Sequence, residues 1–300
     1  AFYYRRNNQE FDLGIAAFNE MDLGKAGIQY INVPLFGHGN EVARKLLKYP
    51  TSVSRTLYQR LCEWATGYSD NRMKRNFTLA DSKWAGELVK RAYGLESQVL
   101  YPPVILCPPD IPWDGRENGF ICSGRITPEK RIETVIEIIR LVRERGFDIH
   151  LHILGGFADP EYGNKIKNYC DVFQSWITME GIVSRSDLAL LLARHRYGIH
   201  GSISEAFGIS VAEMICAGCI PFVPAGGGPA EIVGQDARLV YGNVSEAVEK
   251  IIKIIAKKES GLKISSTLKE KSKKFSADRF KSELLGIVDD FLNNPERKIP

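Results

Sequence analysis

Residues 205–213 read EAFGISVAE, and the sequence around them predicts a strand, a tight loop and a buried helix, in that order. The apolar run 197–201 precedes the stretch, and Val211, Met214 and Ile215 recur at the spacing of a buried helix. Strand–loop–helix units of this kind build parallel sheets that are covered by helices. The stretch therefore favours an α/β fold.

Two carboxylates, Glu205 and Glu213, stand at the ends of this stretch. If both lie on the helix, they are a little over two turns apart and can face the same way. If the helix begins at Gly208 and Ile209, free backbone N–H groups lie between the two acids. That arrangement suits the diphosphate and hydroxyl groups of a nucleotide sugar. The alternative is an ordinary helix with one acid near its N-terminus and the other on its wet face.

A second phosphate-type feature follows the apolar strand 119–123. Arg125 and Lys130 flank the turn that leads from this strand into a helix, and residues 127–128 (Thr-Pro) are a typical helix start. Open α/β sheets bind ligands at such strand ends. Arginine can hold a phosphate with two hydrogen bonds, while lysine acts as a point charge.

Three motifs together resemble the signature of retaining GT-B glycosyltransferases: residues 124–130 (GRITPEK), 205–213 and 226–231 (GGGPAE). The sequence is most similar to the family 4 enzymes, which are nucleotide-sugar-dependent mannosyl- and glucosyltransferases. The resemblance is strong over 118–234 and looser over 12–103. It implies a fold of two Rossmann-like domains.

The resemblance also implies how the chain is divided. We expect an acceptor-side Rossmann-like domain at 1–103, a donor-binding domain at 104–276 and a C-terminal helix at 277–300 that returns to the first domain. The first domain is expected to be incomplete, and the absence of an initiator methionine favours a fragment or a processed chain. Long helices are expected at 41–64 and 128–145.

The site residues are carried over from the family onto matching positions. By resemblance, Arg125 and Lys130 grip the diphosphate, and Glu213 binds the ribose hydroxyl groups. Glu205 is expected near the 3-hydroxyl of the transferred sugar. The other donor-binding residues implied by the resemblance are Gly124, the backbone at Phe207, Gly208 and Ile209, and Gly227 and Gly228 of the glycine-rich loop.

The chemistry that the resemblance implies is a front-face displacement with retention, assisted by the leaving diphosphate. The protein then neutralises the negative charge that grows on that phosphate. The expected donor is GDP-mannose or a UDP-sugar, and neither a metal nor another cofactor is expected. GDP-mannose is preferred because residues 29–34 (QYINVP) look like those of mannosyltransferases of the lipid-linked oligosaccharide pathway.

The chain departs from the family at Asn32, where relatives usually carry histidine. Asparagine can hydrogen-bond a sugar hydroxyl but cannot become cationic beside a phosphate. Asn32 is kept as a catalytic candidate. His38 follows it closely and could take the place of the missing histidine, although an ordinary loop histidine is the favoured interpretation.

The other histidines and the cysteines indicate no site of their own. Cys216 and Cys219 have the spacing of a redox or zinc pair, but no second pair accompanies them, which favours buried structural thiols. The remaining histidines are interpreted as structural: His150, His152, His195 and His200.

Charge suggests a partner surface. Residues 40–91 hold eleven Lys and Arg against five Asp and Glu, a net +6, whereas the whole chain carries +4. Acceptors in this family are often lipid-linked, so this segment could rest on anionic headgroups of a cytosolic membrane face. A solvated basic face is an equal alternative. No nucleic-acid motif is present, and no apolar run reaches a membrane span of about 18 residues.

The expectation is thus a cytoplasmic retaining glycosyltransferase that moves a hexose onto a glycan or glycolipid, with possible peripheral contact to a membrane. A non-catalytic subunit or fragment that only binds nucleotide sugar is the alternative. A GT-B phosphorylase or epimerase is a more remote one.

Overall fold

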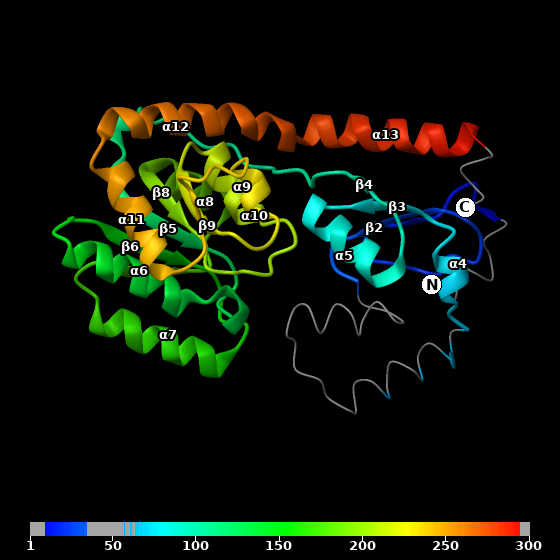
Figure 1. Ribbon diagram of the computed structural model, residues 1–300, viewed down its shortest axis with the longest axis horizontal. Coiled ribbons are helices and arrows are strands. Elements are labelled where there is room, and N and C mark those ends of the chain that lie inside the picture. The colour runs from blue at the N-terminus through cyan, green and yellow to red at the C-terminus, as the bar shows by residue number, and fades with distance from the viewer. Residues whose placement is uncertain (1–9, 35–56, 58–60, 62–63, 66, 295–300) are drawn as a thin grey trace. The chain divides into compact units, whose positions relative to one another are not determined.

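The computed structural model describes residues 10–34, 57, 61, 64–65 and 67–294. The chain divides into two compact units, one of residues 1–102 with 278–300 and the other of residues 103–277. Each unit has a parallel sheet of its own (Figure 1). The expected α/β fold with two Rossmann-like domains is confirmed.

The second unit is built on six parallel strands in the order β10-β9-β8-β5-β6-β7. The chain adds β6 and β7 on one side of β5 and then crosses over to add β8, β9 and β10 on the other side. The strand bounds are β5 Glu117–Ser123, β6 His150–Leu154, β7 Ile177–Gly181, β8 His195–Ile199, β9 Ile220–Pro224 and β10 Val240–Tyr241.

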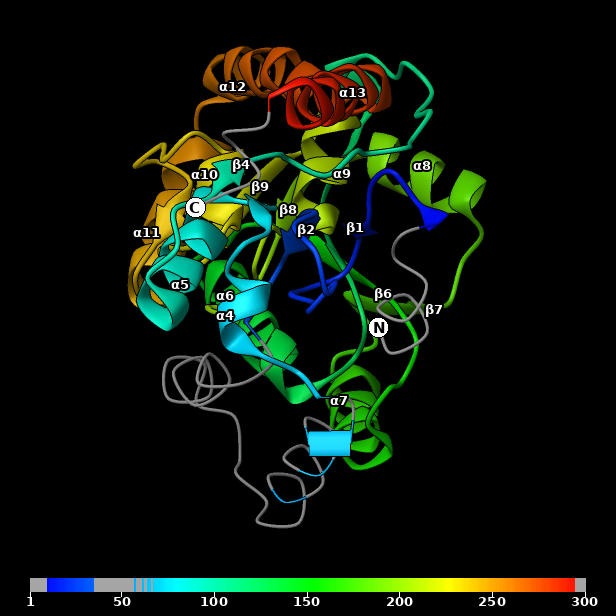
Figure 2. The ribbon, with the colours of Figure 1, turned by 90° about the vertical axis from the view of Figure 1, so that its right-hand side faces the viewer.

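Helices cover both faces of this sheet. Helices α6, α7 and α11 lie on one face, and α8, α9 and α12 lie on the other (Figures 1 and 2). The sequence did not lead us to expect α12 or the short α10. The helix bounds are α6 Ile132–Glu144, α7 Pro160–Val172, α8 Arg185–Arg194, α9 Ile209–Cys216, α10 Pro229–Ile232, α11 Val244–Ile255 and α12 Lys258–Lys271.

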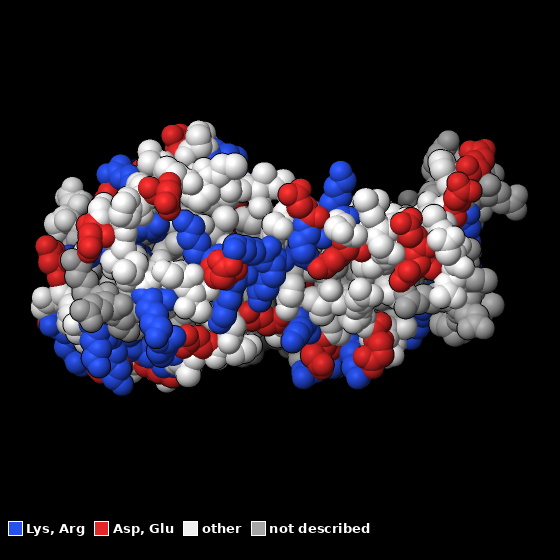
Figure 3. Space-filling view, turned by 90° about the horizontal axis from the view of Figure 1, so that it is seen from above, with Lys and Arg blue, Asp and Glu red and all other residues white. Residues whose placement is uncertain are grey.

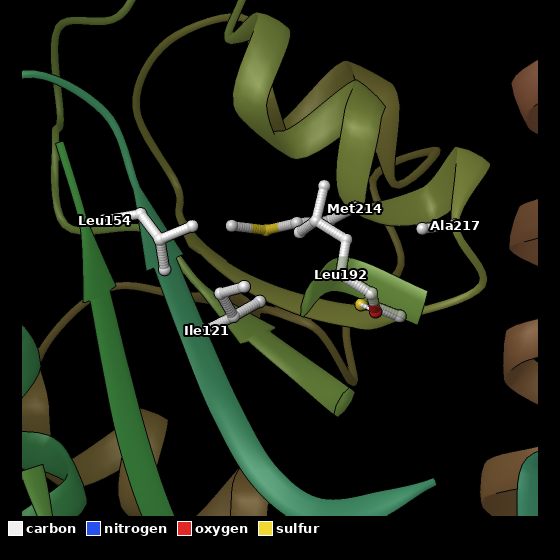
Figure 4. Close-up of a cluster of buried hydrophobic side chains, with 6 residues drawn as sticks. Ile121, Leu154, Leu192, Met214 and Ala217 are labelled. Carbon is white, nitrogen blue, oxygen red and sulfur yellow. Dashed lines mark hydrogen bonds between the residues drawn. The ribbon is translucent and has the colours of Figure 1, made fainter. Parts of the chain in front are cut away.

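A core cluster under α8 and α9 packs near the C-terminal ends of β5 and β6, the edge of the sheet at which the candidate site lies. Ile121 and Leu154 from the sheet meet Leu192 and Met214 from the helices, and all four are buried (Figure 4). Burying an aliphatic side chain contributes about 1.5–3 kcal/mol relative to leaving it exposed. The C-terminal parts of β5 and β6 are therefore fixed against the C-terminal halves of α8 and α9.

Three helices of this unit begin with a side-chain cap. Asp159, Ser184 and Asn243 precede α7, α8 and α11, and each side-chain oxygen accepts a backbone N–H from the first turn. Such caps stabilise a helix by about 1 kcal/mol because they satisfy an N–H that has no partner inside the helix.

The prediction that a helix begins at residue 128 is wrong. Pro128–Lys130 form a single 3₁₀ turn, Arg131 has a left-handed backbone with φ 50°, and α6 begins only at Ile132. Thr127 makes no side-chain cap, and the first N–H of α6 instead donates to the hydroxyl of Tyr162 at 2.8 Å. Tertiary contacts thus replaced the local start signal.

The first unit has four parallel strands in the order β1-β2-β3-β4. Helix α5 begins after Ser82, whose hydroxyl accepts the N–H of Ala85, and it ends at Gly94 with a left-handed backbone. The bounds are β1 Ile15–Ala16, β2 Ile28–Ile31, α4 Asp70–Met73, β3 Phe77–Ala80, α5 Lys83–Tyr93 and β4 Gln98–Val99.

The C-terminal helix α13 (Ala277–Asn293) packs on the strands of this first unit. Ile287 and Phe291 are buried in one cluster with Ile28 and Leu79. Leu285 of the same helix is 52% exposed.

Part of the first unit lies outside the described residues. This includes His38 and most of the helix expected at 41–64. Of the basic segment 40–91, the structure shows Arg72 paired with Asp22 and Lys90 paired with Glu96.

Lys and Arg mix with Asp and Glu over the surface of each unit (Figure 3). Lys269 pairs with Asp110, and Lys273 pairs with Glu270. This agrees with a solvated face at the lysine-rich residues 269–274. No helix in the described part of the chain combines the length and the apolar character needed to cross a membrane.

Candidate active site

The candidate site lies where the strand order of the second unit reverses. Strands β5 and β8 are neighbours, but the chain leaves them toward opposite sides of the sheet. Open α/β sheets bind ligands in the crevice that forms at such a point. A cavity of about 520 Å³ lies there, lined by the loops that follow β5, β6, β7 and β8 and by the starts of α8 and α9. Its size is typical of a small-molecule site.

Two glycines allow the loops after β5 and β6 to meet. A Cβ atom on Gly155 would lie 1.8 Å from the carbonyl oxygen of Gly124, so no larger residue fits. Gly124, which was expected to bind the donor, and Gly155 both line the cavity. Their close approach leaves the backbone of both loops open to a ligand.

Lys130 and Glu205 form an ion pair in the cavity. Lys130 follows β5 and Glu205 follows β8, so the pair bridges the two loops at the point of strand reversal. Their side chains are 17% and 24% exposed. His200, buried at the end of β8, places Nε2 3.6 Å from the same carboxylate. Burial alone would raise the pKa of Glu205, but His200 and Lys130 outweigh it and hold that pKa at about 2.

Glu205 does not lie on the helix, contrary to the idea that both acids share it. Gly208 precedes the helix with a left-handed backbone at φ 96°, and Ile209 is the first residue of α9. A side chain other than glycine is strained in that conformation. The turn brings Glu205 back toward the start of α9, and Glu205 and Glu213 still line one cavity.

Glu213 is buried, not on the wet face of α9. Its side chain is 6% exposed, and Oε1 accepts a hydrogen bond from Arg185 Nη1 at 2.7 Å. Arg185 begins α8 and is itself 60% exposed. The pair places a carboxylate on the cavity wall with a guanidinium beside it.

Of the remaining residues that were expected to bind the donor, some line the cavity wall and others are buried in the protein core. Arg125 is exposed on the cavity wall, and it makes no hydrogen bond to any residue in the described part of the chain. Ile209 also lines the cavity, whereas Phe207 is buried against Phe275. No side chain caps α9. The N–H of Val211 donates to the Gly208 carbonyl at 2.9 Å, so the N–H groups of Ile209 and Ser210 are left for another acceptor.

Gly227 and Gly228 pack beneath the site and do not line the cavity. A Cβ atom on Gly228 would lie 2.1 Å from the carbonyl oxygen of Ala206, and one on Gly227 would lie 2.6 Å from that of Glu205. The N–H of Gly228 donates to the Glu205 carbonyl at 2.9 Å. The glycine-rich loop therefore supports the backbone that carries Glu205. In the described structure it acts through packing.

Two buried hydroxyls at the end of β5 and in the loop after it have no hydrogen-bond partner among the described residues: Ser123 Oγ, which lines the cavity, and Thr127 Oγ1. Buried polar groups are nearly always satisfied, so their grouping suggests a polar ligand or ordered water.

Asn32 belongs to the first unit, at the end of β2, and is described there by itself. Its backbone N–H donates to Asn19 Oδ1 at 3.3 Å. Its own amide oxygen is buried with no partner among the described residues.

Arg185, His200 and Ile182 are site residues that the sequence analysis missed. Ile182 follows β7, lines the cavity and is 85% exposed, and its side chain packs on Gly156. The signal that was available is position: Arg185, His200 and Ile182 each stand within four residues after a strand of one parallel sheet.

The cysteine pair is structural. Cys219 is fully buried, and its Sγ donates to the Leu192 carbonyl at 2.9 Å. Burial raises the pKa of Cys219 to about 12. Cys216 is half-buried at the end of α9.

Comparison with known proteins agrees with this geometry. Residues 108–275, more than half of the chain, match the family model described as glycosyl transferases group 1. A curated relative from Dictyostelium discoideum, GDP-Man:Man(3)GlcNAc(2)-PP-Dol alpha-1,2-mannosyltransferase, is 22% identical over 87% of this chain and 56% of its own length. The protein of the same name from Caenorhabditis elegans is 29% identical over 50% of this chain and 34% of its own length. The matched region thus spans about half or less of these relatives.

Solved structures are similar in fold at low sequence identity. Sucrose-phosphate synthase from Thermosynechococcus elongatus superposes with a TM-score of 0.67 at 14% identity, over 88% of this chain and 68% of that one. WaaG, a glycosyltransferase involved in lipopolysaccharide biosynthesis, gives 0.66 at 16% identity, over 96% of this chain and 80% of that one. The chain belongs to the glycosyl transferases group 1 family and has the GT-B fold of family 4 glycosyltransferases.

Proposed function

We propose that this chain transfers a hexose from a nucleotide-diphosphate sugar to a glycan or glycolipid, with retention of configuration. The observation that carries the proposal is the set of groups that line one cavity at the strand reversal. They are apolar side chains after β7, the carboxylate of Glu213 beside Arg185, and the ion pair of Lys130 with Glu205. These are the kinds of group that would bind the base, ribose, diphosphate and hexose of such a donor.

The base would lie against Ile182 and Val183. Both line the cavity after β7, and Ile182 is 85% exposed although it is a large apolar side chain. An aromatic base packed on this side chain would remove apolar surface from water, which is favourable at about 25 cal/mol per Å².

The ribose would bind Glu213. Arg185 occupies Oε1, and Oε2 has no hydrogen bond to a described residue, so that oxygen can accept from a ribose hydroxyl. Because the carboxylate is almost fully buried, the hydrogen bond would be shielded from water and correspondingly strong.

The diphosphate would lie among Arg125, Lys130 and the first turn of α9. The cavity wall carries the three cations Arg125, Lys130 and Arg185 against the carboxylates of Glu205 and Glu213. The excess of positive charge and the uncapped helix start favour an anion there. Lys130 would also stabilise the charge that develops on the departing phosphate.

The hexose would lie at Glu205, whose low pKa keeps it ionised as a hydrogen-bond acceptor for a sugar hydroxyl. In the proposed reaction the bond from the sugar's anomeric carbon to the diphosphate breaks, and a bond to the acceptor oxygen forms on the same face. The acceptor proton passes to the leaving phosphate oxygen. No metal or cofactor enters this scheme.

We take GDP-mannose as the donor and a lipid-linked oligosaccharide as the acceptor, because the names of both curated relatives specify them. The proposal includes peripheral contact with a cytosolic membrane face through the basic segment 40–91. It does not include nucleic acid as a partner.

The test is a thermal-shift panel of GDP, UDP and ADP sugars, followed by a transfer assay with the best ligand. A ligand at 100 times its dissociation constant adds about 2.7 kcal/mol of stability. Stabilisation by GDP-mannose, and a product with the anomeric configuration of the donor, would support the proposal. An inverted product would refute retention.

A non-catalytic role in binding is the second candidate, and the departure at Asn32 favours it. Its test is turnover of a donor that demonstrably binds. Binding without transfer or hydrolysis, with the acceptor present, would decide for the binding role.

A further inference from the structure

The second notable cluster of the second unit lies at the edge of the sheet opposite the cavity, where the strands begin. Glu117, His150 and His195 are the first residues of β5, β6 and β8, three adjacent strands. Glu117 pairs in register with His195, and His150 stands opposite Gly119. His152, two residues along β6, points to the same face as His150. Together they bring three imidazoles and a carboxylate to one place.

The distances between the polar atoms are those of ligands around one small cation. His150 Nε2 lies 3.3 Å from His195 Nε2 and 3.2 Å from Glu117 Oε2. His195 Nε2 lies 3.7 Å from Glu117 Oε2. A tetrahedron with metal–ligand bonds of about 2.0–2.1 Å has edges of about 3.3–3.4 Å. One ligand atom from each of the four residues, His152 included, lies within 4.8 Å of the others.

The hydrogen bonds of the other ring nitrogens orient the rings. His195 Nδ1 lies 2.7 Å from the Leu191 carbonyl oxygen, which can only accept, so the proton sits on Nδ1 and the lone pair of Nε2 faces Glu117. His152 Nδ1 lies 2.6 Å from Glu180 Oε1. Histidines that bind metals are held in the same way, by a carbonyl or a carboxylate on the nitrogen that does not bind.

The surroundings leave the pocket open to an ion. Gly119 lies beneath the His150 ring, where a Cβ atom would approach Nε2 to 2.1 Å. Arg194 binds Glu117 through Oε1 at 2.8 Å, so Oε2 remains directed at the histidines. A lone pair facing a carboxylate calls for a cation between them.

We propose that Glu117, His150, His152 and His195 form a zinc-type divalent metal site that joins the starts of β5, β6 and β8. Three imidazoles and one carboxylate suit Zn²⁺ among the common metals, and four protein ligands are typical of a structural site. The site lies at the strand starts, whereas the donor cavity lies at the strand ends, so the ion acts on the stability of the sheet.

The test uses the whole chain, freed of metal with a chelator and then titrated with Zn²⁺. We expect one saturable ion per chain by metal analysis. At 100 times the dissociation constant, Zn²⁺ should raise the melting temperature by roughly 5–10 °C. Co²⁺ in the same site should show the visible absorption of a tetrahedral complex with nitrogen and oxygen ligands.

Variants separate this site from surface binding. Glu117→Gln and His150→Gln should each weaken Zn²⁺ by roughly 100-fold or more, because loss of an outer-shell partner alone changes metal affinity by about 10- to 100-fold. Glu180→Gln, which loosens only the orientation of His152, should weaken it by about 10-fold. Asp148→Asn is the matched control, an exposed acid beside the cluster that should leave affinity unchanged.

Circular dichroism establishes that each variant is folded, and His152→Gln replaces any variant that is not. Absence of a saturable ion, or equal Zn²⁺ affinity in wild type and in folded ligand variants, would overturn the proposal. The cluster would then be a hydrogen-bonded group of polar side chains only.

Discussion

Replacing Lys130 with methionine removes the ammonium beside Glu205 while keeping most of the apolar stem. The carboxylate is then left in a mostly buried place with the imidazole of His200 as its remaining polar neighbour. Breaking a buried ion pair by removing one partner is strongly destabilising, because the other charge stays uncompensated.

The magnitude follows from the pKa of Glu205. Its folded value of about 2 stands against an ordinary value of 4.5, and one pH unit corresponds to about 1.4 kcal/mol, so the charged form is stabilised by about 3 kcal/mol. Lys130 shares this effect with His200. We therefore expect Lys130→Met to lower the free energy of unfolding by about 2 kcal/mol at pH 7.

The pH dependence has a definite sign. The folded pKa is lowered, so the contribution is complete above pH 4.5 and is lost as the pH falls toward 2. The total contribution of Glu205 should fall from about 3 kcal/mol at pH 7 to about 2 kcal/mol at pH 3.5. The difference between wild type and Lys130→Met should shrink in the same direction.

The assay is a double-mutant cycle in urea with Lys130→Met, Glu205→Gln and the double variant, at pH 7 and pH 3.5. A coupling energy near 2 kcal/mol is expected at pH 7. The exposed pair Arg140–Glu137 on α6 is the control and should couple by less than about 1 kcal/mol. Additive single effects, within about 0.5 kcal/mol, would refute the reasoning.

Four further predictions concern the site and its support. Glu213→Gln should weaken nucleoside diphosphate binding by about 10- to 100-fold in calorimetry, the worth of a charge-assisted hydrogen bond; unchanged affinity in a folded variant would remove Glu213 from the site. Arg125→Ala should lower kcat more than it raises KM, because charge on the phosphate grows toward the transition state; a change in KM alone would contradict this. Gly228→Ala should destabilise the chain by about 1–3 kcal/mol in urea, because its Cβ would lie 2.1 Å from the Ala206 carbonyl oxygen, whereas Gly286→Ala on α13 has open space and should be neutral or stabilising; equal effects would show that the loop can shift. Asn32→His should raise donor turnover, since a charged hydrogen bond is about twice as strong as a neutral one; loss of activity would show that asparagine is required.

Local signals account for what the sequence predicted correctly. Apolar runs of strand length, with helical spacing after them, placed most elements of the second unit. The start of α9 at Ile209 followed from the glycine before it. Where a contact from elsewhere intervened, the local signal failed: the hydroxyl of Tyr162 caps α6, so Thr127 does not.

The pairing of Lys130 with Glu205 could not be read from spacing, because the two residues are 75 positions apart. They meet only because β5 and β8 are neighbours across the strand reversal. His200 was read as structural for the same reason: its role depends on which loop folds over the end of β8. The glycine-rich loop at 226–228 was predicted to bind the donor, and that remains a prediction. Close packing on residues 203–207 is a second reason for its composition.

Parallel strands place all their ends at one edge of a sheet and all their starts at the other. The rule that ligands of α/β proteins bind beyond the ends of the strands predicted Arg125 and Glu205 as site residues. The same rule gives no role to Glu117, His150 and His195, because they begin strands and are far apart in sequence. The strand register that brings the cavity loops together also brings these three residues and His152 together at the opposite edge of the sheet. Chemistry-bearing residues at the starts of adjacent parallel strands therefore deserve the same scrutiny as those at the ends, because strand register brings both sets together with equal certainty.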